Sequence, residues 1–224
     1  MKENTKRNKK NKKPWPTKAA MAQVYRENLW GGESNTFYSG DGSHRPELVQ
    51  PYIDSVTTFL NSFQERISVC DLGCGDFNVG KELVKHTKSY VAIDIVPELV
   101  AYNQEKFKAD NLSFQCLDIA VDELPTADCV LLRQVLQHLS NAEVQRVVDK
   151  LPNYKYVILT EHLPVGDFIP NKDIISGQGI RLKRQSGLDL LASPFNLRIK
   201  EKKELLSVDL ERGKGRIVTW LYKI

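Results

Sequence analysis

The sequence contains no apolar run that approaches the 18 residues of a membrane-spanning helix, and no apolar stretch follows its basic first residues. We therefore expect neither a membrane span nor a secretory signal. Cysteine is scarce: the four residues are Cys70, Cys74, Cys116 and Cys129, and none forms a C-x-x-C pair. We expect these cysteines to be reduced and structural in a cytoplasmic protein. No cluster of Cys and His has the spacing of a zinc site, so no metal site is predicted.

Patterns for binding phosphate or single-stranded nucleic acid are missing as well. No Gly-Lys-Ser/Thr follows the glycines at 73 and 75, which excludes a P-loop. Basic residues are not interleaved with aromatic ones, as they are in single-strand binders. Internal repeats are absent too. The 224 residues are 41% hydrophobic and 27% charged, which suits one globular domain with small additions.

Positive charge is concentrated at one end of the chain. Residues 1–13 contain seven lysines and arginines and one glutamate, a net charge of +6, which leaves −2 on residues 14–224. We expect residues 1–14 to be a disordered basic tail. Only this tail offers weak contact with a polyanion, through residues 1–13, because the remainder is slightly acidic.

Beyond the tail, short apolar runs alternate with helical patterns. Strands are predicted at 67–70, 90–93, 112–117, 129–132 and 156–160, and helices at 46–63, 79–84, 97–107 and after the S-x-x-E capping box at 140–143. Such alternation predicts an α/β fold with a mostly parallel sheet covered by helices on both faces. Two last strands, 205–210 and 217–221, flank a Gly-containing turn and predict an antiparallel C-terminal hairpin.

Acidic residues stand at the ends of four predicted strands: Asp71, Asp94, Asp118 and Glu161. The carboxyl ends of parallel strands share one edge of a sheet, where ligands bind. Gly73 and Gly75 follow Asp71, but the third glycine of a dinucleotide fingerprint is absent. This acidic edge disfavours phosphates and favours a nucleoside with free ribose hydroxyls and a cationic group.

At these positions the sequence resembles the class I S-adenosylmethionine-dependent methyltransferases, which have a Rossmann-like fold. The resemblance rests on V-C-D-L-G-C-G-D (69–76), A-I-D-I (92–95), L-D-I (117–119) and L-R-Q-V-L-Q-H-L (132–139). It implies a seven-stranded sheet and S-adenosylmethionine as cofactor. The residues it implies for cofactor binding are Asp71, Gly73, Gly75, Asp94 (ribose), Ile95, Asp118 (adenine amine), Ile119 (adenine ring) and Arg133 (near the methionine moiety). The third glycine of the family motif is replaced here by Phe77.

A looser resemblance covers residues 15–64, which we expect to form a helical N-terminal lid in front of a core at 65–224. In this hypothesis Trp30, Tyr38 and the Ser39–Ser43 loop cover the cofactor and the acceptor, and Gln134 lies near the acceptor. A long segment at 165–197 is a candidate substrate lid. Within it, Arg181, Lys183 and Arg184 either meet an anionic acceptor or form a solvated face.

Three residues are candidates for catalysis. His162 and Glu161 follow the fifth predicted strand and face the expected acceptor side, where a histidine can remove a proton. Lining the pocket is the alternative for both. His138 precedes the Ser140 cap and is either catalytic or a packed, capping residue.

The predicted function is methyl transfer from S-adenosylmethionine to an oxygen or nitrogen nucleophile of a small-molecule acceptor. Two alternatives stay open: an RNA or protein methyltransferase that uses the basic tail as a tether, and a non-catalytic S-adenosylmethionine-binding protein. No Asn/Asp-Pro-Pro-Tyr signature follows the fourth strand, so methylation of the adenine amino group or of a glutamine amide is not indicated. The acceptor itself is not encoded in any motif, because acceptor choice in this family lies in lids and loops.

Overall fold

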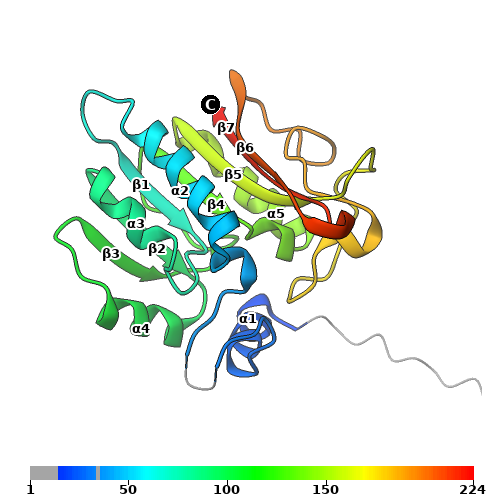
Figure 1. The fold of residues 1–224 in the computed structure, drawn as a ribbon, viewed down its shortest axis with the longest axis horizontal. Coiled ribbons are helices and arrows are strands. Elements are labelled where there is room, and N and C mark those ends of the chain that lie inside the picture. Colours follow the sequence, from blue (N-terminus) through cyan, green and yellow to red (C-terminus); the bar gives the residue numbers. More distant parts are fainter. Residues whose placement is uncertain (1–14, 34–35) are drawn as a thin grey trace, which may run out of the picture.

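The computed structural model describes residues 15–33 and 36–224, so the predicted tail at 1–14 and its polyanion contact lie outside the described residues. In this part of the chain one sheet has seven strands, in the order β3-β2-β1-β4-β5-β7-β6 (Figure 1). The strands are β1 (Ser68–Leu72), β2 (Ser89–Asp94), β3 (Leu112–Cys116), β4 (Cys129–Arg133), β5 (Tyr156–Leu163), β6 (Glu201–Asp209) and β7 (Arg216–Lys223).

The first five strands pair in parallel, and β7 alone runs in the opposite direction. β1 pairs in parallel with β2 and with β4, β2 with β3, and β4 with β5, whereas β7 runs antiparallel to both β5 and β6. The predicted α/β fold with an antiparallel C-terminal hairpin is therefore confirmed. The chain crosses over between β3 and β4, so the carboxyl ends of β1 and β4 flank the point where ligands bind in such sheets.

Five α-helices accompany the sheet in the described residues: α1 (Thr17–Arg26), α2 (Pro46–Leu60), α3 (Gly80–Leu83), α4 (Pro97–Lys106) and α5 (Asn141–Val148). Pro46 and Pro97 occupy the first helical position, where the missing N–H costs nothing. The predicted capping box is present, with Ser140 as N-cap and Glu143 as its partner. No described helix has the length and apolar character needed to cross a membrane.

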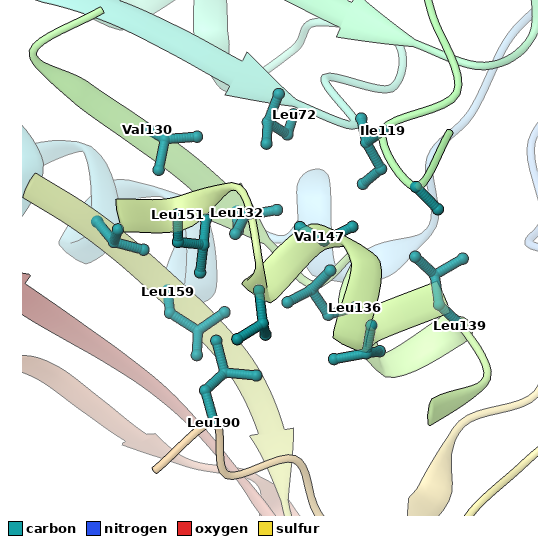
Figure 2. Close-up of a cluster of buried hydrophobic side chains, with 14 of the residues drawn as sticks. Leu72, Ile119, Val130, Leu132, Leu136, Leu139, Val147, Leu151, Leu159 and Leu190 are labelled. Carbon is teal, nitrogen blue, oxygen red and sulfur yellow. The ribbon is translucent and has the colours of Figure 1, made fainter. Parts of the chain in front are cut away.

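Alternate strand residues build two hydrophobic cores. Val130, Leu132 and Leu159 point to the face covered by α5, where they pack with Val147 and Leu151 (Figure 2). Residues of the opposite register face α2 and α3 and form the second cluster: Val69, Cys129, Leu131 and Ile158 pack there with Val56, Leu60 and Leu83. The helices therefore cover both faces, as the near-continuous apolar strands predict.

Two segments differ from the expected pattern. β5 runs to Leu163, three residues beyond the predicted end, because its antiparallel pairing with β7 continues through Glu161 and His162. The segment 165–197 contains no strand and only one short helical turn, Arg181–Arg184. All four cysteines are free thiols, and Cys116 is exposed rather than part of the core.

Candidate functional site

A cavity of about 460 Å³ lies beyond the carboxyl ends of β1, β2 and β4. Its volume falls in the range of small-ligand sites. Most of the predicted site residues line it together: Trp30, Asp71, Gly73, Gly75, Asp94, Ile95, Asp118, Ile119, Arg133, Gln134 and His138. The motifs that lie far apart in the sequence therefore meet at one site.

The glycine turn after β1 forms the floor of this cavity. Gly73 has φ +79° and a Cβ there would collide with Val135, while Gly75 has φ +57° and a Cβ would collide with the Ser39 side chain. Phe77, which stands where the family has a glycine, also has a positive φ of 61°. Its ring is fully buried and lies 4.8 Å from the Phe114 ring in edge-to-face geometry. Burial of this ring offsets the backbone strain of about 1–2 kcal/mol for a non-glycine residue in that conformation.

Asp94 ends β2 as a fixed, buried carboxylate. Its Oδ2 accepts a hydrogen bond from the Gly75 N–H (3.1 Å) and its Oδ1 accepts one from the Val96 N–H (3.1 Å). Burial raises the pKa of Asp94 to about 6, although the backbone N–H donors oppose this shift. Additional donors on a ligand, such as ribose hydroxyls, would stabilise the ionised form.

A second buried acid lies beneath the turn, next to an arginine. Asp71 Oδ2 accepts a hydrogen bond from the Tyr90 hydroxyl (2.8 Å), and burial raises the pKa of Asp71 to about 6. Arg133 lies with its guanidinium 4.9 Å from the centre of the Tyr52 ring and donates to the Gly42 carbonyl and to Ser43 Oγ. Its Nε is buried and has no partner in the described residues.

Asp118 follows β3 at the far side of the cavity. Its Oδ1 accepts a hydrogen bond from the Ala120 N–H (2.9 Å), which fixes the loop after the strand. Ile119 is buried next to it and lines the cavity. This pairing of a carboxylate with an apolar side chain suits a flat heteroaromatic base that carries an amine.

The N-terminal segment, which includes Tyr25, Ser39 and His44, lies over the glycine turn and is hydrogen-bonded to it. Ser39 N–H donates to Asp76 Oδ2 (2.8 Å), Ser39 Oγ accepts from the Asp76 N–H (2.8 Å), and the Tyr25 hydroxyl lies 2.9 Å from Ser39 Oγ. His44 Nε2 lies 2.6 Å from the same Asp76 carboxylate oxygen. Figure 1 shows α1 at the strand ends that form the site (Figure 1).

Trp30 and His138 lie in contact in the cavity lining. Their ring centres are 5.1 Å apart with a tilt of 48°. His138 Nδ1 lies 3.2 Å from the Gly177 carbonyl oxygen, and its Nε2 lies 3.3 Å from Gln137 Nε2. Burial lowers the pKa of His138 to about 4, so the imidazole is neutral near pH 7.

Three predicted residues do not line the cavity. Tyr38 stacks on His44 at 4.2 Å and donates to Asp41 Oδ1 (2.8 Å) beside the N-terminal segment. His162 points to the other face of β5, where its Nε2 lies 2.8 Å from the Lys214 carbonyl oxygen. Glu161 is fully buried, and neither carboxyl oxygen has a partner in the described residues. The extension of β5 explains the last two placements, since both residues lie within the strand instead of beyond it.

Several residues that line the cavity are not predicted from the sequence, among them Tyr25, Gln137 and Gln178, whereas Ser39 belongs to the 39–43 loop that is expected at the site. Tyr25 and Ser39 belong to the N-terminal pattern, and their roles depend on a hydrogen bond between residues 14 positions apart. Gln137 neighbours His138 in the fourth motif. Gln178 has no local signal, since its side chain donates to the Leu29 carbonyl, 149 positions away (2.7 Å).

Comparison with known proteins gives the following findings. Residues 70–154 match a family model described as a methyltransferase domain. Over 63 residues the chain is 35% identical to the malonyl-[acyl-carrier protein] O-methyltransferase of Acetivibrio thermocellus, which covers 27% of this chain and 22% of that protein. Over 167 residues it is 25% identical to an uncharacterized RNA methyltransferase of Chlamydia pneumoniae, which covers 67% of this chain and 41% of that protein. The matches thus span less than half the length of these curated relatives.

Solved structures share the fold at low sequence identity. The N-methyltransferase NodS from Bradyrhizobium japonicum, in complex with S-adenosyl-L-homocysteine, has a TM-score of 0.65 at 12% identity and covers 91% of this chain and 98% of its own. The magnesium protoporphyrin IX methyltransferase from Synechocystis, with the same ligand, has a TM-score of 0.59 at 17% identity and covers 93% of this chain and 100% of its own.

Proposed function

We propose that this chain, which carries a methyltransferase domain with the class I fold, binds S-adenosylmethionine and methylates an oxygen or nitrogen atom of a small molecule. One observation carries the proposal: the glycine turn and the acids after β1, β2 and β3 converge on a single cavity that the N-terminal segment covers. The cavity lining has four aspartates, Asp71, Asp76, Asp94 and Asp118, against Arg133 and Lys183. That balance suits a nucleoside ligand that carries positive charge.

The residues present fit the parts of this cofactor. Asp94 would accept hydrogen bonds from the ribose hydroxyls, and Asp118 would accept one from the adenine amine while Ile119 packs on the ring. Arg133, which lines the cavity, would hold the carboxylate of the methionine part. When bound, S-adenosylmethionine supplies an electrophilic methyl group on a positively charged sulfur.

The acceptor would lie at the end of the cavity bounded by Trp30, Gln134, His138 and Gln178. Trp30 offers an aromatic face, and the neutral His138 can take a proton from an acceptor hydroxyl or amine. Most of the rate enhancement would come from holding the acceptor against the methyl donor in the orientation for reaction. Glu161 and His162 stay outside this arrangement because neither lines the cavity.

A small acceptor fits the covered cavity better than a polymer does. The N-terminal segment and the 177–180 loop meet across it through Gln178 and Leu29. Several similar structures are named for small acceptors, including the human N-acetylserotonin methyltransferase and the magnesium protoporphyrin IX methyltransferase. These observations support the small-molecule proposal over the RNA or protein alternative.

Two measurements test the proposal. Calorimetry should detect binding of S-adenosylmethionine and of its demethylated product, and no binding at millimolar ligand would contradict it. Incubation with methyl-labelled S-adenosylmethionine and fractionated cell extract should then place the label in the small-molecule fraction. Label in RNA or protein would favour the tethered alternative, and binding without transfer to any fraction would indicate a non-catalytic protein.

A further inference from the structure

The long segment between β5 and β6 contains a buried arginine that the proposed reaction does not use. Arg181 is 2% exposed. Its Nη1 donates to the carbonyl oxygens of Leu136 (3.2 Å) and Gln137 (3.4 Å). Its Nη2 donates to the Leu139 carbonyl (2.8 Å) and to Asn141 Oδ1 (2.7 Å). Neither sequence-based reading of Arg181 holds, since it faces neither solvent nor the cavity.

These four acceptors make the guanidinium a clamp on one turn of the chain. A buried charge is tolerated only where hydrogen bonds satisfy it, and the planar fork of arginine suits several carbonyls at once. The clamped carbonyls belong to residues 136, 137 and 139, which connect β4 to α5. Residue 138 lies between them, so the clamp fixes the backbone that carries the His138 ring.

The same segment also holds the ring itself. Gly177 N–H donates to the His138 carbonyl (3.0 Å), and the Gly177 carbonyl lies 3.2 Å from His138 Nδ1. A carbonyl can only accept, so Nδ1 carries the proton and Nε2 is an acceptor, 3.3 Å from the Gln137 amide nitrogen. Arg181 follows Gly177 by four positions, so one short stretch fixes both the backbone of His138 and its tautomer.

Glu161 completes the surroundings of Arg181. Burial lowers the pKa of the guanidinium, and the nearby Glu161 carboxyl opposes that shift. Burial in turn raises the pKa of Glu161 to about 8, against the field of Arg181. Glu161 therefore belongs to the buried surroundings of Arg181 and does not line the cavity.

We propose that Arg181 is a positioning residue of the acceptor site, which holds the 136–139 turn so that Gln137 and His138 face the cavity. The role rests on the proposed function, because it concerns the group that would take the acceptor proton. The proposal also gives a role to the 165–197 segment: through Arg181, this segment is hydrogen-bonded to the turn after β4 and fixes one side of the acceptor site.

Histidine titration by NMR tests the clamp without any methyl transfer. The variants are Arg181→Gln and Arg181→Lys, with Arg184→Gln as the matched control, because Arg184 lies in the same helical turn but is exposed. The wild-type His138 should titrate near pH 4. Both Arg181 variants should raise its pKa by a unit or more toward the ordinary value, and Arg184→Gln should leave it unchanged. The spectrum of a His138→Asn variant identifies the signal among the four histidines.

The lysine variant separates positioning from charge. Arg181 also lowers the pKa of His138 through its field, so the glutamine variant alone would respond to the lost charge. Lysine keeps the charge and loses the fork. The proposal would be overturned if the pKa of His138 in Arg181→Lys equalled the wild-type value, or if neither Arg181→Lys nor Arg181→Gln shifted it. If the Arg181 variants do not fold, Asn141→Ala removes one acceptor of the clamp and should shift the pKa in the same direction.

Kinetics supply a second readout once an acceptor is known. Both Arg181 variants should lower kcat about tenfold while the affinity for S-adenosylmethionine changes less than twofold, because Arg181 lies outside the cavity lining. Unchanged kcat would count against positioning. A shifted His138 pKa in a protein that transfers no methyl group would refute the proposed function and leave the clamp intact.

Discussion

At the end of the cavity proposed for the cofactor, the carboxylates come mainly from the strands that end there. Asp71 lies in β1, Asp94 ends β2 and Asp118 follows β3, and backbone N–H groups of the adjoining loops, those of Gly75 and Ala120, donate to Asp94 and Asp118. At the acceptor end the walls come from segments far apart in the sequence. Trp30 meets His138, and Gln178 bonds to the backbone 149 positions before it.

The two ends also differ in charge. The cofactor end gathers carboxylates whose pKa values are raised by burial, to about 6 for Asp71 and Asp94. The acceptor end has a neutral imidazole, whose pKa burial lowers to about 4, beside the indole of Trp30 and two glutamine amides. We therefore expect the cofactor end to bind a positively charged ligand. The acceptor end is uncharged at His138 and offers its imidazole as a base. Changes at the two ends should separate binding of the cofactor from turnover.

The largest effect is expected at the acceptor end. His138→Asn should lower kcat by 100-fold or more, because loss of a general base costs about 10²–10⁴-fold. Affinity for S-adenosyl-L-homocysteine should stay within twofold of the wild type. A turnover assay with the identified acceptor and calorimetry of the product measure the two quantities. An unchanged kcat would remove His138 from the reaction.

The next largest effect is expected at the cofactor end. Asp94→Ala should weaken S-adenosylmethionine binding by about 2 kcal/mol, roughly 30-fold, because two ribose hydroxyls lose a charged acceptor. Glu98→Ala is the control, since Glu98 is an exposed acid on α4 outside the cavity. Isothermal calorimetry compares the three proteins. Equal affinities for all of them would remove Asp94 from the site.

The affinity for the cofactor, measured against pH, should reflect the raised pKa values of the carboxylates at the cofactor end. The pKa of Asp94 is raised to about 6, and donors on the ligand favour the ionised carboxylate, so binding becomes coupled to release of a proton below that pH. Affinity for the cofactor should therefore fall as the pH drops from 7 to 5, by at most about tenfold per unit. Asp94→Asn cannot titrate and should flatten the profile. Asp71 titrates in the same range, so a residual slope is expected.

The contrast also explains how far sequence reasoning reaches. Strand ends such as Asp94 and Asp118 can be located from local pattern, because a parallel sheet places its carboxyl ends along one edge. The same rule misplaces Glu161 and His162, since the length of β5 depends on β7, which follows it by more than fifty residues. Arg181 shows the limit most clearly. Its sequence context suggests a solvated face, whereas its partners lie 40 to 45 positions away.

A smaller effect is expected where the N-terminal segment meets the glycine turn. Tyr25→Phe removes the hydroxyl that lies 2.9 Å from Ser39 Oγ and should cost about 1 kcal/mol, close to fivefold, in cofactor affinity. Tyr38→Phe is the matched control, because its hydroxyl bonds to Asp41 outside the cavity lining. Equal losses in both variants would show that the contact does not bear on the cofactor.

The smallest effect is expected from the basic N-terminus. Removal of residues 1–13 takes away a net charge of +6 and leaves the chain at −2. For a small acceptor, kcat/KM at low salt should stay within twofold of the full chain, because every cavity residue of the described structure is kept. A polyanionic acceptor would behave differently, since several phosphate contacts give a steep salt dependence. Two results together would therefore favour a tethered RNA acceptor. The truncated chain would lose most of its activity at low salt, and the full chain would show a similar loss in 0.5 M salt.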